Sequence, residues 1–452
     1  MKPNSPFMVF TVPIVTAIWS VVLITISAAA QLPFGDGLQP VDSATLADGL
    51  TAEVAPASPI ETTLMYARAG RTSSMIELFS FYCKANDTEA ARQWINRAME
   101  MDDPMAEVTM GIALSSLSAT PGCLKSDDTA AVLLLMKSAP TLNNPEALYL
   151  LGLHLLRGVG TVRSDAAGLE FMRKSALRGY APASVELGDF EMRAHPNDEL
   201  AAARAYMHYV RAARLNDLRG ITRLAHALKT GAGCAENLSE SLKLYRLAAS
   251  RGDVGSMEQL VEFGLNGWGL TAADAVAYAK AAMDTGSEIA FIKYWEFVAH
   301  GIGGLTADRD GAIRELEKRA EGSSRVMIAI VRLIASPPET MSKRDKARAR
   351  QLLERAVARR NLDGILMLAA AYDRGGWLRG NGQRVHELLA LAKDKNSEGA
   401  YAVGLYYAKR NAKGDMSRAK TLMADAAERG SQSAQAWLAE RDGNGARNTG
   451  KR

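Results

Sequence analysis

Two closely spaced glycines are the first feature of this sequence that could do chemistry. Residues 151–165 read LGLHLLRGVGTVRSD, so Arg157 directly precedes Gly158, and Gly160 follows two residues later. Glycines beside a basic residue are found in turns that bind phosphate, because their backbone N–H groups can approach an anion closely. Whether these glycines bind phosphate decides whether the chain is an enzyme.

The rest of the sequence offers little other chemistry. No two of the six histidines stand three or four residues apart, so a zinc-binding helix motif is absent from the sequence. A nucleophile elbow, a Walker loop and a strand-linked dinucleotide fingerprint are also missing. We therefore predict a non-enzymatic protein without catalytic residues, metal or cofactor.

Three cysteines leave at least one thiol unpaired in a monomer. Cys83 stands at the end of one helical segment and Cys123 in the turn of the next unit. In an oxidising compartment these two residues would form a disulfide. The alternative is that Cys83, Cys123 and Cys234 are all small buried residues.

A basic segment is a candidate site for an anionic ligand such as an acidic polysaccharide. Residues 341–360 read MSKRDKARARQLLERAVARR, with eight basic residues against Asp345 and Glu354. At helical spacing, one face carries Arg344, Arg348, Arg355 and Arg359. The alternative is an ordinary solvated helix face.

Two tryptophans lie in or beside glycine-rich turns. Trp268 and Trp377 would stack on a sugar or on a partner chain. The alternative is that each ring covers the helix pair beneath its turn.

The elements that position these residues recur along the chain. The glycine pattern of residues 151–165 returns in four further segments: KTGAGCAEN at 229–237, LNGWGLT at 265–271, AHGIGGLTAD at 299–308 and DRGGWLRGN at 373–381. A phosphate-binding loop would occur once. We therefore interpret these glycines as left-handed residues that end one helix and direct the chain into the next.

A helix-capping signal has the same period. In each unit a polar residue stands eleven positions before a residue of the following helix that is usually small. The side chains of such polar residues accept hydrogen bonds from free backbone N–H groups at a helix start. They are Asp87, Asp127, Asp165, Asn237, Thr271, Asp308, Asp345, Asn381 and Asp415, with Ala201 as the one misfit. Their spacing of 34 to 40 residues is typical of a helix–turn–helix repeat.

Composition agrees with a helical protein that does not bind nucleic acid. Alanine, leucine and arginine are abundant, whereas β-branched and aromatic residues are sparse, which favours helices. The 54 basic residues against 50 acidic ones leave a net charge of +4 over 452 residues. So small a charge over so long a chain does not attract nucleic acid.

The segment ALYLLGLHLLRGVGTVRSDAAGLEFMRKSALRGYAPA, residues 147–183, resembles the Sel-one-like repeat, a relative of the tetratricopeptide repeat. The resemblance implies an all-α, right-handed α/α solenoid of about ten helix–turn–helix repeats over residues 66–440. It also implies a concave face that binds other proteins. The match is weak in the first two units and in the units whose turns read RAHPND and ASPPETMSKRD.

Both ends of the chain fall outside the predicted repeats. Residues 1–30 hold an apolar run followed by Ala28, Ala29 and Ala30, which is typical of a signal peptide or, if uncleaved, a signal anchor. Residues 31–65 are rich in proline and glycine and predict a linker. Residues 441–452 predict a disordered basic tail.

Together these features predict a protein-binding scaffold of the bacterial cell envelope, periplasmic or secreted, or anchored in the inner membrane. The chain resembles periplasmic scaffolds of exopolysaccharide secretion in fold, size and compartment. The alternative is a periplasmic regulator that binds and restrains a sensor kinase. Membrane contact is expected only through the amino-terminal segment.

Overall fold

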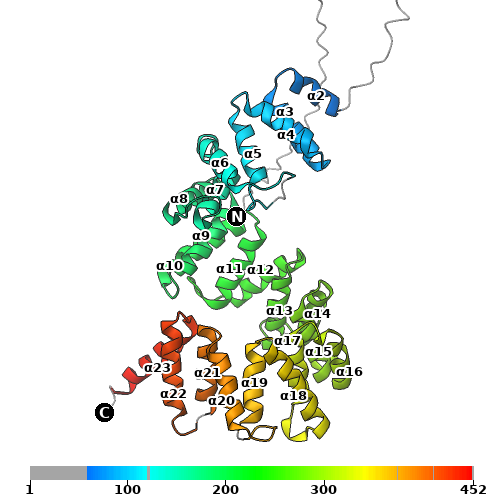
Figure 1. The fold of residues 1–452 in the computed structure, drawn as a ribbon, viewed down its shortest axis with the longest axis vertical. Helices are drawn as coiled ribbons and strands as arrows, with labels where there is room; N and C mark the ends of the chain where they lie inside the picture. Colours follow the sequence, from blue (N-terminus) through cyan, green and yellow to red (C-terminus); the bar gives the residue numbers. More distant parts are fainter. Residues whose placement is uncertain (1–58, 120–122, 374, 411, 450–452) are drawn as a thin grey trace, which may run out of the picture. The chain divides into compact units, whose positions relative to one another are not determined.

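The computed structural model describes residues 59–119, 123–373, 375–410 and 412–449, and this part of the chain is helical (Figure 1). It contains twenty-two α-helices, two short 3-10 helices and no strand among the described residues. The described residues from 62 onward belong to one structural unit. The all-α prediction is confirmed.

Helix α2 (Pro59–Arg68) is followed by ten helix pairs and by α23 (Gln432–Thr449) in the described ranges. The pairs are α3 (Thr72–Lys84) with α4 (Thr88–Met99), α5 (Pro104–Leu114) with α6 (Asp128–Leu142), α7 (Pro145–Arg157) with α8 (Asp165–Leu177), α9 (Ala181–Ala194) with α10 (Glu199–Arg214), α11 (Leu218–Thr230) with α12 (Leu238–Ser250), α13 (Val254–Asn266) with α14 (Ala272–Asp284), α15 (Glu288–His300) with α16 (Arg309–Ala320), α17 (Ser324–Ile334) with α18 (Lys343–Ala358), α19 (Leu362–Tyr372) with α20 (Gly382–Lys393), and α21 (Ser397–Arg410) with α22 (Asp415–Glu428). The 3-10 helices Ile302–Gly304 and Pro338–Thr340 lie in two of the turns.

From α3 to α23 each helix packs on its neighbours in the chain, which makes this part an α/α solenoid. Small residues allow close packing within and between pairs. A Cβ atom on Gly152 would lie 3.0 Å from the carbonyl oxygen of Gly168 in the partner helix. One on Gly220 would lie 2.5 Å from the Cβ of Ala212 in the preceding pair. Larger side chains at these positions would push the helices apart.

The predicted cap is correct in six of the ten second helices. The capping residues there are Asp87, Asp127, Asn237, Thr271, Asp308 and Asn381, each accepting a backbone N–H bond. The prediction is wrong for Asp165, Asp345 and Asp415. Ser164 caps α8, and Gly414 precedes α22.

Two second helices begin three residues before the predicted register. Asp198 caps α10, so Ala201 already lies inside that helix. Ser342 caps α18 and forms a capping box with Asp345. The turns before these two helices lack paired glycines. Because a polar residue three positions upstream accepts from the first free N–H groups, each helix starts before the predicted position.

The predicted boundaries differ from the structure at both ends of the solenoid. Helix α2 starts at Pro59, within the predicted linker 31–65, because proline is well suited to the first turn of a helix. Helix α23 runs to Thr449, although a disordered tail was expected from residue 441. The predicted signal segment, residues 1–30, lies outside the described residues, and no helix that the structure describes is long and apolar enough to cross a bilayer.

The corrected cap of α8 gives a stability prediction. Ser164→Ala should lower the free energy of unfolding by about 0.5–2 kcal/mol, because the N–H of Ala167 loses its acceptor. Asp165→Ala should leave the thermal midpoint nearly unchanged, because Asp165 pairs with the exposed Arg163 instead. Thermal unfolding followed by circular dichroism compares the two variants. Equal losses would contradict the assignment of Ser164 as the cap.

Candidate interaction surface

The glycines of residues 151–165 build the turn between α7 and α8. Gly158 ends α7 in the left-handed conformation, with φ of +67°, and its N–H bonds to the carbonyl oxygen of His154. Gly160, with φ of +70°, lies against the previous repeat, where a Cβ would be 2.4 Å from the carbonyl oxygen of Asp128. The first glycine therefore ends the helix, and the second admits the neighbouring backbone.

Three of the other four turns repeat this geometry. Left-handed glycines end α11, α13 and α15, and a second left-handed glycine follows two residues later: Gly231 with Gly233, Gly267 with Gly269, and Gly301 with Gly303. The fifth turn differs because α19 is followed by Asp373 in an extended conformation. The helix-ending interpretation is thus confirmed in four turns of five.

The two glycine roles predict different mutational costs. Gly158→Ala should destabilise by roughly 1–2 kcal/mol, the cost of left-handed backbone in a residue with a Cβ. Gly160→Ala should cost more, because its new Cβ would also overlap the carbonyl oxygen of Asp128. Denaturant unfolding of the two variants measures the difference. An equal cost would argue against close contact between the repeats at Gly160.

His154, in the same stretch, supports the turn. Its ring is fully buried, with Nδ1 2.8 Å from the carbonyl oxygen of Val159 and Nε2 2.8 Å from Oγ of Ser115. Since a carbonyl only accepts, Nδ1 donates to Val159, while Nε2 and the Ser115 hydroxyl share the second hydrogen bond. Asp128 lies 3.8 Å from the same Nε2, whereas a catalytic triad has its carboxylate on Nδ1. This buried arrangement is structural.

Cys83 and Cys123 form a disulfide between successive repeats. Their Sγ atoms lie 1.99 Å apart and their Cα atoms 5.1 Å apart. Cys83 belongs to α3, and Cys123 lies between α5 and α6. Cys234 keeps a free thiol in the turn after α11, where burial raises its pKa.

The basic face of residues 341–360 is largely engaged within the protein. These residues include α18, and its arginines contact the preceding second helix, α16, and the turn after it. Arg348 bonds to Glu317, and Arg355 lies 3.8 Å from Glu321. Arg359 donates to the backbone carbonyl of Glu321. Arg344 is exposed, so the four residues do not form one free patch.

Both tryptophans pack on the helices beneath their turns. Trp268 meets Phe263 edge to face, with ring centroids 5.4 Å apart, and Nζ of Lys229 lies 5.8 Å from its ring centre. Trp377 packs on the hydrophobic core around α19. Each ring is half-buried, as expected for a side chain that covers the helix pair beneath its turn. Stacking of either ring on a ligand stays a prediction.

Ion pairs between successive first helices were not predicted from the sequence. On α9, Asp189 is buried and accepts from Tyr209 at 2.9 Å and from Arg223 of α11 at 2.9 and 3.1 Å. Arg219 of α11 bonds to Glu186 of α9 at 3.0 Å. Lys229 of α11 continues the series with a 2.6 Å bond to Glu262 of α13. Their spacing of 33 or 34 residues, close to the repeat length, is the signal that would have revealed them.

Two cavities open beside these ion pairs. One, of about 320 Å³, lies between α9, α10 and α11, and its lining includes Asp189, Tyr209, Arg223 and His226. Burial lowers the pKa of His226, and the charge of Lys229 adds to this effect. The other, of about 460 Å³, is lined by Arg157, Glu186 and residues around them from α7 to α9. The first helices therefore present hollows with charged walls.

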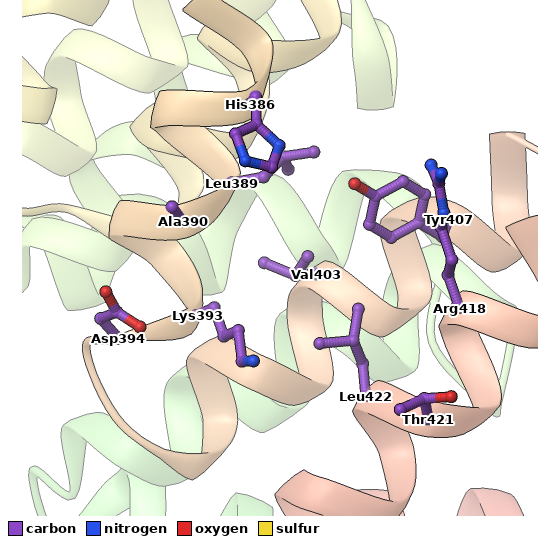
Figure 2. A pocket seen from close by; sticks show the side chains of 10 residues that line it. All are labelled: His386, Leu389, Ala390, Lys393, Asp394, Val403, Tyr407, Arg418, Thr421 and Leu422. Carbon is purple, nitrogen blue, oxygen red and sulfur yellow. The ribbon is translucent and has the colours of Figure 1, made fainter.

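A larger cavity, of about 630 Å³, lies between α20, α21 and α22. Figure 2 shows Val403 of α21 between the side chains of α20, among them His386 and Leu389, and those of α22, among them Leu422. Tyr407 and Arg418 lie next to each other at one side. The groups of three or more histidine, cysteine or acidic residues that a metal would need are not found among the described residues.

Comparison with known families identifies the repeat. The Sel1 repeat model matches residues 145–180, 219–253 and 340–361. These three segments are similar to Sel1 repeats. Sel1 repeat proteins generally mediate protein–protein interaction and are typically non-catalytic.

Similar solved structures include c5321, a protective antigen of uropathogenic Escherichia coli with an SLR fold. It is 17% identical, over 84% of this chain and 97% of that chain, with a TM-score of 0.41. A Sel1 repeat protein from Oxalobacter formigenes is 19% identical, over 64% of this chain and 80% of that chain, with a TM-score of 0.46. No curated protein matches the chain.

Proposed function

We propose that this protein is a non-catalytic scaffold of the bacterial cell envelope that binds protein partners along its first helices. The observation that carries the proposal is the pair of hollows beside the first helices, one between α7, α8 and α9 and the other between α9, α10 and α11, whose walls combine charged and apolar groups. Such surfaces suit side chains of a partner better than a reacting small molecule, because no nucleophile–base pair lines them.

The envelope location is supported by two separate features. The Cys83–Cys123 disulfide would persist in an oxidising compartment and would be reduced in the cytosol. The apolar run of residues 7–27 followed by three alanines provides an export signal. The two features lie in different parts of the chain and favour the same compartment.

Assembly of an exopolysaccharide synthesis and export complex is the finer form of this proposal. It rests on the resemblance in fold, size and compartment to periplasmic scaffolds of that process, which is an analogy. The engaged arginines of α18 favour protein partners over direct binding of an acidic polysaccharide at that helix.

The disulfide gives a stability test of the compartment. Cys83→Ser with Cys123→Ser should lower the free energy of unfolding by about 2–4 kcal/mol under oxidising conditions, because the unfolded chain loses its crosslink. Cys234→Ser is the matched control and should change little. Added reductant should bring the wild type down to the double variant. Three titratable thiols in protein isolated under native conditions would contradict the bridge.

Localisation and binding are tested together in cells. A photo-crosslinking residue at His226, in the hollow between α9 and α11, should capture a partner in the envelope fraction. The same residue at Leu247, exposed on the second helix α12, is the control and should capture none. Amino-terminal sequencing should give a chain starting at Gln31 for a cleaved signal. A cytoplasmic chain with intact Met1 would overturn the location, and capture only from position 247 would overturn the binding face.

A further inference from the structure

An arginine recurs at one position of the last three second helices. It stands three residues after the repeat marker: Arg348 after Asp345, Arg384 after Asn381 and Arg418 after Asp415. In α18 and α20 this arginine bonds to a glutamate of the preceding second helix. Arg348 contacts Glu317, and Arg384 lies 3.0 Å from Glu354.

The partner glutamate is missing for Arg418 of α22, because the preceding second helix, α20, lacks it. Both Glu317 and Glu354 stand nine residues after their own markers, and the residue at that position in α20 is Ala390. Ala390 is exposed and lines the 630 Å³ cavity together with Arg418. Replacing a glutamate by alanine therefore leaves both an open space and an arginine without its usual carboxylate.

No described carboxylate takes the place of the missing one. Asp415, one turn before Arg418, binds Arg410 through two 2.7 Å bonds and accepts from the backbone of Ala412. These bonds to Arg410 lower the pKa of the Asp415 carboxyl, and the nearby charge of Arg418 adds to this effect without an ion pair between the two. The guanidinium of Arg418 lies 5.9 Å from the ring centre of Tyr407, and within the described ranges no ion pair to Arg418 is formed.

The cavity around Arg418 combines positive charge with an aliphatic floor. Leu389, Val403 and Leu422 form the floor, and Lys393 and His386 line the walls on the α20 side (Figure 2). Asp394 lies beside Lys393 at the end of α20. The side near Arg418 and Tyr407 is thus the part suited to a negatively charged group.

We propose that this cavity binds an acidic segment of a protein partner, with a glutamate or aspartate on Arg418 and a neighbouring aliphatic side chain on the floor. The incoming carboxylate would take the role that Glu317 and Glu354 have in the two preceding repeats. An aliphatic floor suits a leucine-like side chain better than a hydroxyl-covered sugar ring, which favours a peptide over an acidic polysaccharide. The site is separate from the hollows of the first helices.

The test uses the purified chain and a random twelve-residue peptide library displayed on phage. Wild-type protein should enrich peptides with an acidic residue beside a bulky aliphatic one. Ala390→Glu restores the internal carboxylate, so it should keep the thermal midpoint of the wild type and fail to enrich these peptides. Equal enrichment by both proteins, or enriched peptides without an acidic residue, would overturn the proposal.

A fluorescent copy of the most enriched peptide then measures affinity. Arg418→Gln should weaken its binding at least about tenfold, because a charge-assisted bond is lost. Arg384→Gln removes the same charge from the equivalent position one repeat earlier and should change affinity less than about twofold. Equal losses in the two variants would show a general charge effect and overturn the site. Tighter binding of polygalacturonate than of the peptide would overturn the choice of a protein ligand.

Discussion

The close approach of backbone from one repeat to the next is the constraint on which the rest of the structure depends. A Cβ on Gly160 would lie 2.4 Å from the carbonyl oxygen of Asp128, and one on Gly233 would lie 2.1 Å from that of Ala202. Only glycine allows both this approach and a left-handed turn. In the repeats with these turns, the distance to the preceding repeat follows from this spacing.

Local signals made the fold predictable from the sequence, since each glycine turn and most caps act within a few residues. The errors arose where two polar residues compete for one helix start. Ser164 and Asp165 are adjacent, and either would satisfy a spacing rule, yet Ser164 caps α8. At α18, Ser342 and Asp345 act together, and a rule that looks for one capping residue chose the second. Boundaries of this kind depend on how each turn meets its neighbour, which spacing alone does not reveal.

The candidate sites were less predictable because their partners are distant in the sequence. The basic run of residues 341–360 was interpreted as a possible free patch, but Glu317 and Glu321, which engage it, lie in the preceding repeat. Likewise Asp189 and Arg223 are 34 residues apart, although their side chains are in contact. Comparing equivalent positions of successive repeats would have exposed these pairs, because contacts between repeats recur near the repeat length.

The repeat architecture also explains how one position can change its chemistry without disturbing the fold. Ion pairs near the surface contribute about 0–1 kcal/mol, so the half-buried pair of Arg384 with Glu354 is a small part of the stability of its repeat. Stability in a solenoid is distributed over many similar interfaces. Having Ala390 where the preceding repeats have a glutamate therefore removes little stability, while it leaves an open cavity and an accessible Arg418. Equivalent positions of successive repeats can therefore be compared directly. Where one repeat has a different residue at a surface position that contributes little to stability, a binding site can arise at little cost to the fold.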